Sequence, residues 1–149
     1  MDIKGFFTKF FDGTYLRRLL GIKFYDEIDN VTGFDRRTGQ MAEGVVQFKV
    51  ALQNLDLALR NRGLTKDSVA KVTINMVTDN DVYNVENWEI MKGMWLEYFG
   101  RGVYDIDPND PDGQRRPIGA IISVPFIPGA DLIPGAPCWM TLTVKVETN

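Results

Sequence analysis

Hydrophobic residues at helical spacing predict two amphipathic helices. Between Glu43 and Gly63, apolar side chains recur every three or four residues and form one stripe along a helix. Gly63 suits the position just after that helix, because glycine readily adopts the left-handed backbone conformation found there. A second apolar stripe predicts a helix over about 82–99, and the carboxyl groups of Asp79 and Asp81 are candidates for its N-cap.

Alternating or β-branched stretches predict the strands. After the first strand, Phe34–Met41 predicts a hairpin turn in which Asp35 caps the turn and Gly39 takes a positive φ. Further along the chain, β-branched and apolar runs indicate three more strands. Residues 64–77 are predicted to form a short loop and then a strand, and the other predicted strands cover residues 21–31, about 118–125 and about 138–147.

The order of these elements predicts an α+β fold in a single domain, residues 1–149. Two strand–helix passes onto one sheet place both helices on the same face, so we expect one mixed sheet with two helices packed on one face. The chain has no further element to cover the other face, apart from its N-terminal segment. We therefore expect the chain to oligomerise through its sheet.

Two segments stand outside this pattern. Residues 1–12 carry phenylalanines at helical spacing and are interpreted as an amphipathic N-terminal extension. We expect it to pack on its own domain or on a neighbouring subunit; a helix lying on a membrane surface is the alternative. Residues 100–117 are rich in aspartate, glycine and proline, which indicates a long loop. Such a loop in a small domain is usually functional or mobile.

The residue types that are absent limit the chemistry. The chain has no histidine and one cysteine, Cys138, which excludes Cys/His zinc sites, histidine-based triads and internal disulfides. A net charge of −3 argues against nucleic-acid binding, which requires basic surfaces. No apolar run is long enough to span a membrane, and a single cysteine gives no sign of an oxidising compartment, so we expect a cytoplasmic protein. Catalysis would then use carboxylates, Arg, Lys, Tyr, backbone groups, bound water or the one thiol.

Several short motifs along the chain share a pattern with a known family. They are GTY at 13–15, FDRRTGQM at 34–41, the helix-and-strand run at 47–81, WLEYFG at 95–100 and the two final strands. Together they resemble the Rid (YjgF) family of reactive-intermediate deaminases. The resemblance implies a Rid/chorismate-mutase-like subunit that forms a homotrimer with an inner barrel and with ligand clefts between subunits. It also implies a hydrolase that needs no cofactor and converts enamines and imines to ketones and ammonia.

The resemblance places substrate contacts on the penultimate strand. In deaminating members an arginine there binds the substrate carboxylate, which a planar guanidinium suits. Aligned on the end of the strand, that position falls on Gly119, and the small residues after it fall on Ala120 and Ile121. Arg116 lies three residues earlier. It either binds the carboxylate from the loop or is, like Arg115, a solvated loop residue.

Further positions match the family's cleft. The glutamate that positions the attacking water in deaminating members corresponds to Thr143, which can hold a water but cannot act as its base. Asp29 and Asn30 stand where the family has a small Ser-Gly pair. Asp29 is either the replacement carboxylate or, with Asn30, an ordinary polar strand end. Tyr15 matches a tyrosine that lines the cleft.

Two functions follow as hypotheses. The first is hydrolytic deamination of a small enamine, imine or amino-dienoate such as a 2-aminomuconate. Arg116 would bind a carboxylate and Asp29 would transfer the proton, while Tyr15 and Asn30 would shape the cleft. The second is a diverged Rid-like protein without deaminase activity, which binds a small ligand or serves another step of a specialised metabolic pathway. A ribonuclease fits least, because the chain is acidic and has no histidine.

Overall fold

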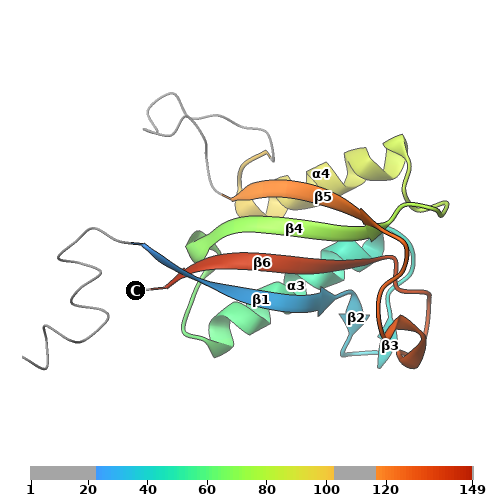
Figure 1. The fold of residues 1–149 in the computed structure, drawn as a ribbon, viewed down its shortest axis with the longest axis horizontal. Helices are drawn as coiled ribbons and strands as arrows, with labels where there is room; N and C mark the ends of the chain where they lie inside the picture. The colour runs from blue at the N-terminus through green and yellow to red at the C-terminus, as the bar shows by residue number, and fades with distance from the viewer. Residues whose placement is uncertain (1–22, 103–116, 149) are drawn as a thin grey trace, which may run out of the picture.

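The computed structural model of the chain describes residues 23–102 and 117–148, which form a sheet with helices on one side (Figure 1). The sheet strands are β1 (Phe24–Thr32), β4 (Val69–Val77), β5 (Ile118–Val124) and β6 (Met140–Thr148). The helices are α3 (Val46–Asn61) and α4 (Val85–Phe99), and the short elements are β2 (Phe34–Asp35), β3 (Gln40–Met41), η1 (Lys66–Ser68) and η2 (Ala130–Leu132). The expected α+β class is confirmed. The extension 1–12 and most of the loop 100–117 lie outside the described residues.

The sheet is mixed, as predicted, and its strand order is β1-β6-β4-β5. β6 pairs antiparallel with β1 and with β4, whereas β5 runs parallel to β4. The parallel pair is connected through α4, because a parallel neighbour requires a crossover. β1 and β5 are therefore the two edges of the sheet, and they lie on opposite sides of it (Figure 1).

The core lies between the helices and one face of the sheet. The predicted apolar stripe of α3 is confirmed: Phe48, Leu55 and Leu59 are each at most 1% exposed. The side chains of β4 alternate, so that every second one is buried under the helices and the others face away from them. Of the helices in residues 23–102 and 117–148, none is long and apolar enough to cross a membrane.

The helix ends agree with the sequence at α3 and differ from it at α4. Gly63 has the expected positive φ, 70°, just beyond α3. The N-cap of α4 is Asn84, so the prediction of Asp79 or Asp81 is wrong. The reason lies in the preceding turn, where the Asn80 side chain accepts hydrogen bonds from the backbone N–H groups of residues 82 and 83. Residues 80–83 therefore form a turn, and α4 begins at Val85, three residues later than the sequence predicts.

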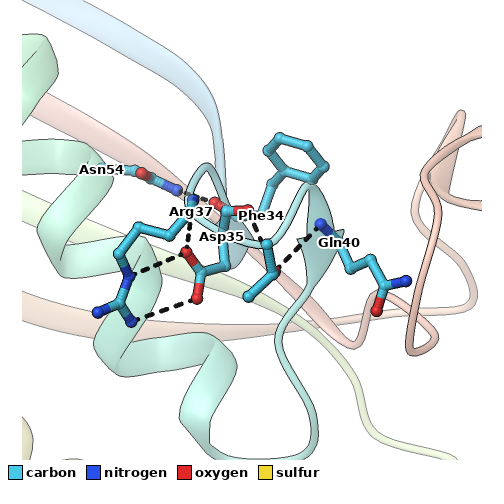
Figure 2. A network of polar contacts seen from close by, with 6 residues as sticks. Phe34, Asp35, Arg37, Gln40 and Asn54 are labelled. Carbon is cyan, nitrogen blue, oxygen red and sulfur yellow. Dashed lines mark hydrogen bonds and ion pairs between the residues drawn. The ribbon is translucent and has the colours of Figure 1, made fainter.

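The predicted hairpin turn is confirmed in Phe34–Met41. Figure 2 shows Asp35 at its start, where one carboxylate oxygen accepts the backbone N–H of Arg37 at 2.9 Å. The Arg37 side chain also donates to Asp35, and these hydrogen bonds hold the pKa of Asp35 below its usual range. Gly39 closes the turn with a φ of 72°. Strands β2 and β3 pair on either side of it.

Two amide side chains of α3 attach the neighbouring loops to the helix. Asn54 donates hydrogen bonds of 2.8 Å to the backbone carbonyls of residues 32 and 34. Gln47 is fully buried; its amide nitrogen donates to the carbonyl of Pro137, and its amide oxygen accepts the backbone N–H of Trp139 at 2.9 Å. These contacts fix the chain that leaves β1 and the chain that enters β6.

Candidate functional site

A β-bulge brings three of the predicted site residues together. The register of β1 on β6 shifts between Ile28 and Val31, so Asp29 and Asn30 both lie opposite Thr143. Asn30 has a φ of 56°, a left-handed conformation that asparagine tolerates better than most residues. The bulge leaves Asp29 and Asn30 exposed at the edge of the sheet, next to the central strand that carries Thr143.

Asp29 forms a carboxyl pair with Glu27, a residue that the sequence analysis did not single out. The two side chains are two positions apart on β1 and lie on the same face, away from the helices. Their hydrogen bond raises the pKa of Glu27 above the ordinary 4.5, and the negative charge of Asp29 raises it further. A carboxyl group whose pKa is raised keeps its proton to higher pH, which is the direction of shift that an acid catalyst needs.

The same face of the sheet carries basic and hydroxyl groups beside the acids. Lys145 is the β6 partner of Glu27, and its amino group lies 4.4 Å from the centre of the Tyr25 ring. These side chains border a shallow hollow of about 480 Å³, together with Lys71, Thr73 and Thr143. The hollow is therefore polar and contains charges of both signs.

The hydroxyl group of Thr143 is oriented by Asn75, another residue that the sequence analysis missed. The Asn75 amide donates to the Thr143 oxygen at 3.0 Å and to the Thr141 oxygen at 3.4 Å. Asn75 points away from the helices because it alternates with the buried residues Ile74 and Met76 of β4. That alternation was visible in the sequence, but the pairing of β4 with β6 was not.

The other two described site residues, Gly119 and Ile121, lie on the opposite face. They pair with Val72 and Ile74 of β4, which are buried beneath the helices, and Ile121 packs against the core. Three strand spacings, or about 14 Å, separate β5 from β1 within the sheet. Within one subunit, the residues around Asp29 and the pair Gly119 and Ile121 are therefore too far apart to form one site.

The remaining candidates add little to this arrangement. Tyr15 and Arg116 lie outside the described residues. Cys138 is buried, and burial raises the pKa of its thiol, so the thiolate needed for nucleophilic attack is disfavoured. Among residues 23–102 and 117–148, no three His, Cys, Asp or Glu side chains gather in a way that could hold a metal ion.

The carboxyl pair makes a testable contribution to stability. A raised pKa of Glu27 in the folded state means that the pair favours folding below pH 4.5 and loses this contribution as pH rises through the folded pKa. Glu27→Gln removes the charge repulsion but, like the protonated acid, can still donate a hydrogen bond to Asp29, so it is expected to raise the Tm at neutral pH and to leave it unchanged in acid. Thermal unfolding across pH measures this, with the exposed Glu43→Gln as control. A gain in Tm that is equal at both pH values would contradict the carboxyl pair.

No protein-family model and no curated protein matches the sequence of this chain. Solved structures do match. The Rid-family protein YyfA from Yersinia pestis aligns with a TM-score of 0.57 and 19% identity over 83% of this chain and 80% of that one. This chain has the Rid fold. The Rid fold also relates it to E. coli TdcF, solved with bound serine, at a TM-score of 0.58 and 11% identity over 84% and 81% of the two chains.

A mycobacterial structure extends the Rid match over more of the chain. Rv2704 from Mycobacterium tuberculosis, a member of the YjgF/YER057c/UK114 family, aligns over 92% of this chain and 95% of that one. Its TM-score is 0.53 and its identity 15%. The expected Rid-type arrangement of one sheet and two helices is thereby confirmed.

Proposed function

We propose that this Rid-fold chain hydrolyses a small enamine or imine, or an amino-dienoate such as a 2-aminomuconate, at clefts between the subunits of a homotrimer. Water adds to the iminium carbon, the carbon–nitrogen bond breaks, and a carbonyl compound and ammonia leave. The observation that carries the proposal is the Glu27–Asp29 carboxyl pair beside the bulge of β1. It supplies the carboxylate that the Rid resemblance requires and that Thr143 cannot supply.

The pair suits the two proton transfers of this reaction. The ionised carboxylate accepts a proton from the attacking water, and the protonated partner donates one to the departing nitrogen. The hydrogen bond and the negative charge of Asp29 raise the pKa of Glu27, which is the direction that a proton donor needs. Lys145, across from Glu27 on β6, limits the net charge of the site. No metal or organic cofactor enters these steps.

The location of the residues supports a cleft made by two subunits. Asp29 is on the edge strand β1, and Arg116 precedes the opposite edge strand β5 by two residues in the sequence. They can share a cleft only where β1 of one copy meets β5 of another. Ile118 and Ile122 of β5 are 41% and 51% exposed on the face away from the helices, an apolar surface that a second copy would cover. Arg116 would bind the substrate carboxylate, and Tyr15 would line the cleft.

A second candidate function is a Rid-like protein without deaminase activity. It would bind a small ligand at the same clefts or serve another step of a specialised metabolic pathway. Two observations favour it. The hydroxyl of Thr143 is already bound by the amide of Asn75, and Gly119 has no side chain with which to bind a carboxylate.

Ammonia release distinguishes the two functions. The purified chain is expected to accelerate ammonia release from freshly generated 2-aminoacrylate or from a 2-aminomuconate. Asp29→Asn is expected to lower kcat by about a hundredfold, because it removes the proton acceptor. The matched control is Asp26→Asn, on the same strand, whose carboxylate accepts a hydrogen bond from Arg62, just beyond α3, at 3.4 Å. An intact trimer that accelerates neither reaction would favour the second function.

Mixed assemblies test the inter-subunit cleft. Asp29→Asn and Arg116→Ala subunits are each expected to be inactive alone. If each cleft takes Asp29 from one subunit and Arg116 from the next, random co-assembly restores about one quarter of the clefts. Unfolding and refolding the two variants together, followed by the ammonia assay, measures this recovery. A monomeric protein, or no recovery in intact mixed trimers, would contradict the cleft.

A further inference from the structure

Two lysines lie side by side at the polar hollow on the sheet face away from the helices. Lys71 of β4 and Lys145 of β6 are direct cross-strand partners, and both are exposed and border the hollow. The Cβ atoms of such partners are about 4.5–5.5 Å apart, and like charges at this separation destabilise a pair of strands. The lysine pair therefore favours a negative charge beside it, from a side chain or from a bound anion.

The acids in the described part of the chain leave Lys71 without a counter-charge. Lys145 lies opposite Glu27 on its other side, whereas the other cross-strand neighbour of Lys71 is Ile118. Asp26, the second acid at the hollow, is already hydrogen-bonded to an arginine. Within residues 23–102 and 117–148, the amino group of Lys71 forms neither an ion pair nor a hydrogen bond.

The hydroxyl group of Thr143 adds a hydrogen-bond donor beside the lysines. Its oxygen accepts the amide N–H of Asn75 at 3.0 Å, and its O–H donates to no residue in the described ranges. A hydroxyl can donate one hydrogen bond while its oxygen accepts another, so this O–H is available to a ligand in the hollow. Two ammonium groups and one hydroxyl donor suit a carboxylate, because hydrogen bonds between charged groups are the stronger ones.

We propose that Lys71 and Lys145, with the hydroxyl of Thr143, bind one carboxylate of a dicarboxylate substrate. This inference rests on the proposed deaminase function, in which Arg116 binds another substrate carboxylate. It narrows the substrate class to amino-dienoates with a carboxylate at each end, such as a 2-aminomuconate. Substrates with a single carboxylate, such as 2-aminoacrylate, would leave the lysine pair unused.

The arrangement of charges across the sheet favours a carboxylate far from the reacting carbon. The lysine pair lies one and two strand spacings from the Glu27–Asp29 pair on β1, or about 5 and 10 Å. A carboxylate next to the reacting carbon would lie beside these acids, which repel it, whereas one at the far end of a six-carbon diene would lie over the lysines. The hollow of about 480 Å³ is larger than a bare inorganic anion requires, and the Tyr25 ring at its border can pack against a diene.

Muconate and sorbate are the matched probes, because both are six-carbon dienes and sorbate lacks one of the two terminal carboxylates. Neither can be deaminated, so calorimetric titration at neutral pH measures binding whether or not the chain is an enzyme. The unchanged chain is expected to bind trans,trans-muconate about tenfold more tightly than sorbate. Lys71→Met removes the charge at similar side-chain length and should abolish this preference, whereas Lys71→Arg should retain it.

Lys49→Met is the control, since Lys49 is exposed on α3 and its loss changes the net charge equally but away from the hollow. Its preference for muconate should equal that of the unchanged chain. The proposal is overturned if Lys71→Met keeps the preference, or if the unchanged chain binds muconate no more tightly than sorbate. Tighter binding of inorganic phosphate than of muconate would likewise overturn a dicarboxylate as the ligand.

Ammonia release from 2-aminomuconate separates this proposal from the deaminase function on which it rests. Deamination by a chain that does not prefer muconate would overturn the dicarboxylate site alone. A preference for muconate that is lost in Lys71→Met, in a chain that releases no ammonia, would support the site and contradict the deaminase function.

Discussion

Replacing Gly33 with alanine is expected to destabilise the fold by about 3 kcal/mol or more, the upper part of the range for overpacked interiors. Gly33 is buried between β1 and the hairpin, where the chain crosses the start of α3. An added Cβ would lie 2.6 Å from the Cα of Gln47 and 2.7 Å from its carbonyl oxygen. These are backbone atoms, so no rotamer change can relieve the clash. Urea unfolding of the variant measures the loss.

The matched control for Gly33 is Gly93, in the middle of α4. A Cβ there meets no atom within 4 Å. Gly93→Ala should therefore stabilise the chain by about 0.5–1 kcal/mol, because alanine is the better helix former. The two substitutions are chemically identical and should act in opposite directions. Equal free energies of unfolding for Gly33→Ala and the unchanged chain would show that α3 can move away from the loop.

Gln47→Leu is expected to have the second large effect, a loss of about 3 kcal/mol in the free energy of unfolding. Leucine has a similar volume, so packing changes little. It leaves two backbone groups, the carbonyl of Pro137 and the N–H of Trp139, without their side-chain partner. Each such unpaired group costs about 1–3 kcal/mol when water cannot reach it. Hydrogen exchange should locate the opening in residues 137–139.

The control for Gln47 lies six residues further along the same helix. Gln53 is exposed, and Gln53→Leu should change the free energy of unfolding by less than about 0.5 kcal/mol. Similar losses from both substitutions would mean that leucine destabilises α3 generally. The contacts of Gln47 with the loop before β6 would then not explain the effect.

The parts of the fold that sequence alone predicts are those set by local periodicity. The stripe containing Phe48, Leu55 and Leu59 identified α3, because burial on one side of a helix repeats every three or four residues. The hairpin turn followed from Asp35 and Gly39, whose roles depend only on neighbouring backbone. The predicted N-cap of α4 is wrong because several Asp and Asn residues lie close together before the helix, and each can act as a cap. Which of them caps the helix depends on the hydrogen bonds of the whole turn.

The candidate site depended on pairing between distant segments, which local patterns do not contain. Family resemblance named Asp29, Asn30 and Thr143, but only the register of β1 on β6 shows that a bulge places them opposite one another. Glu27 and Asn75 were missed for the same reason: alternation gives the face of a strand but not its partner. The roles of Tyr15 and Arg116 stay predictions.

The bulge at Asp29 and Asn30 makes β1 one residue longer than core packing requires. Ile28 and Val31 are both buried although they stand three positions apart, whereas a regular strand buries every second side chain. A chain lacking Asn30 would bury the same two side chains in unbroken alternation. The extra residue is thus equivalent to a single-residue insertion that leaves the buried side chains of β1 unchanged. Sequence change at this edge can alter which polar groups are presented there while the hydrophobic interior keeps its composition.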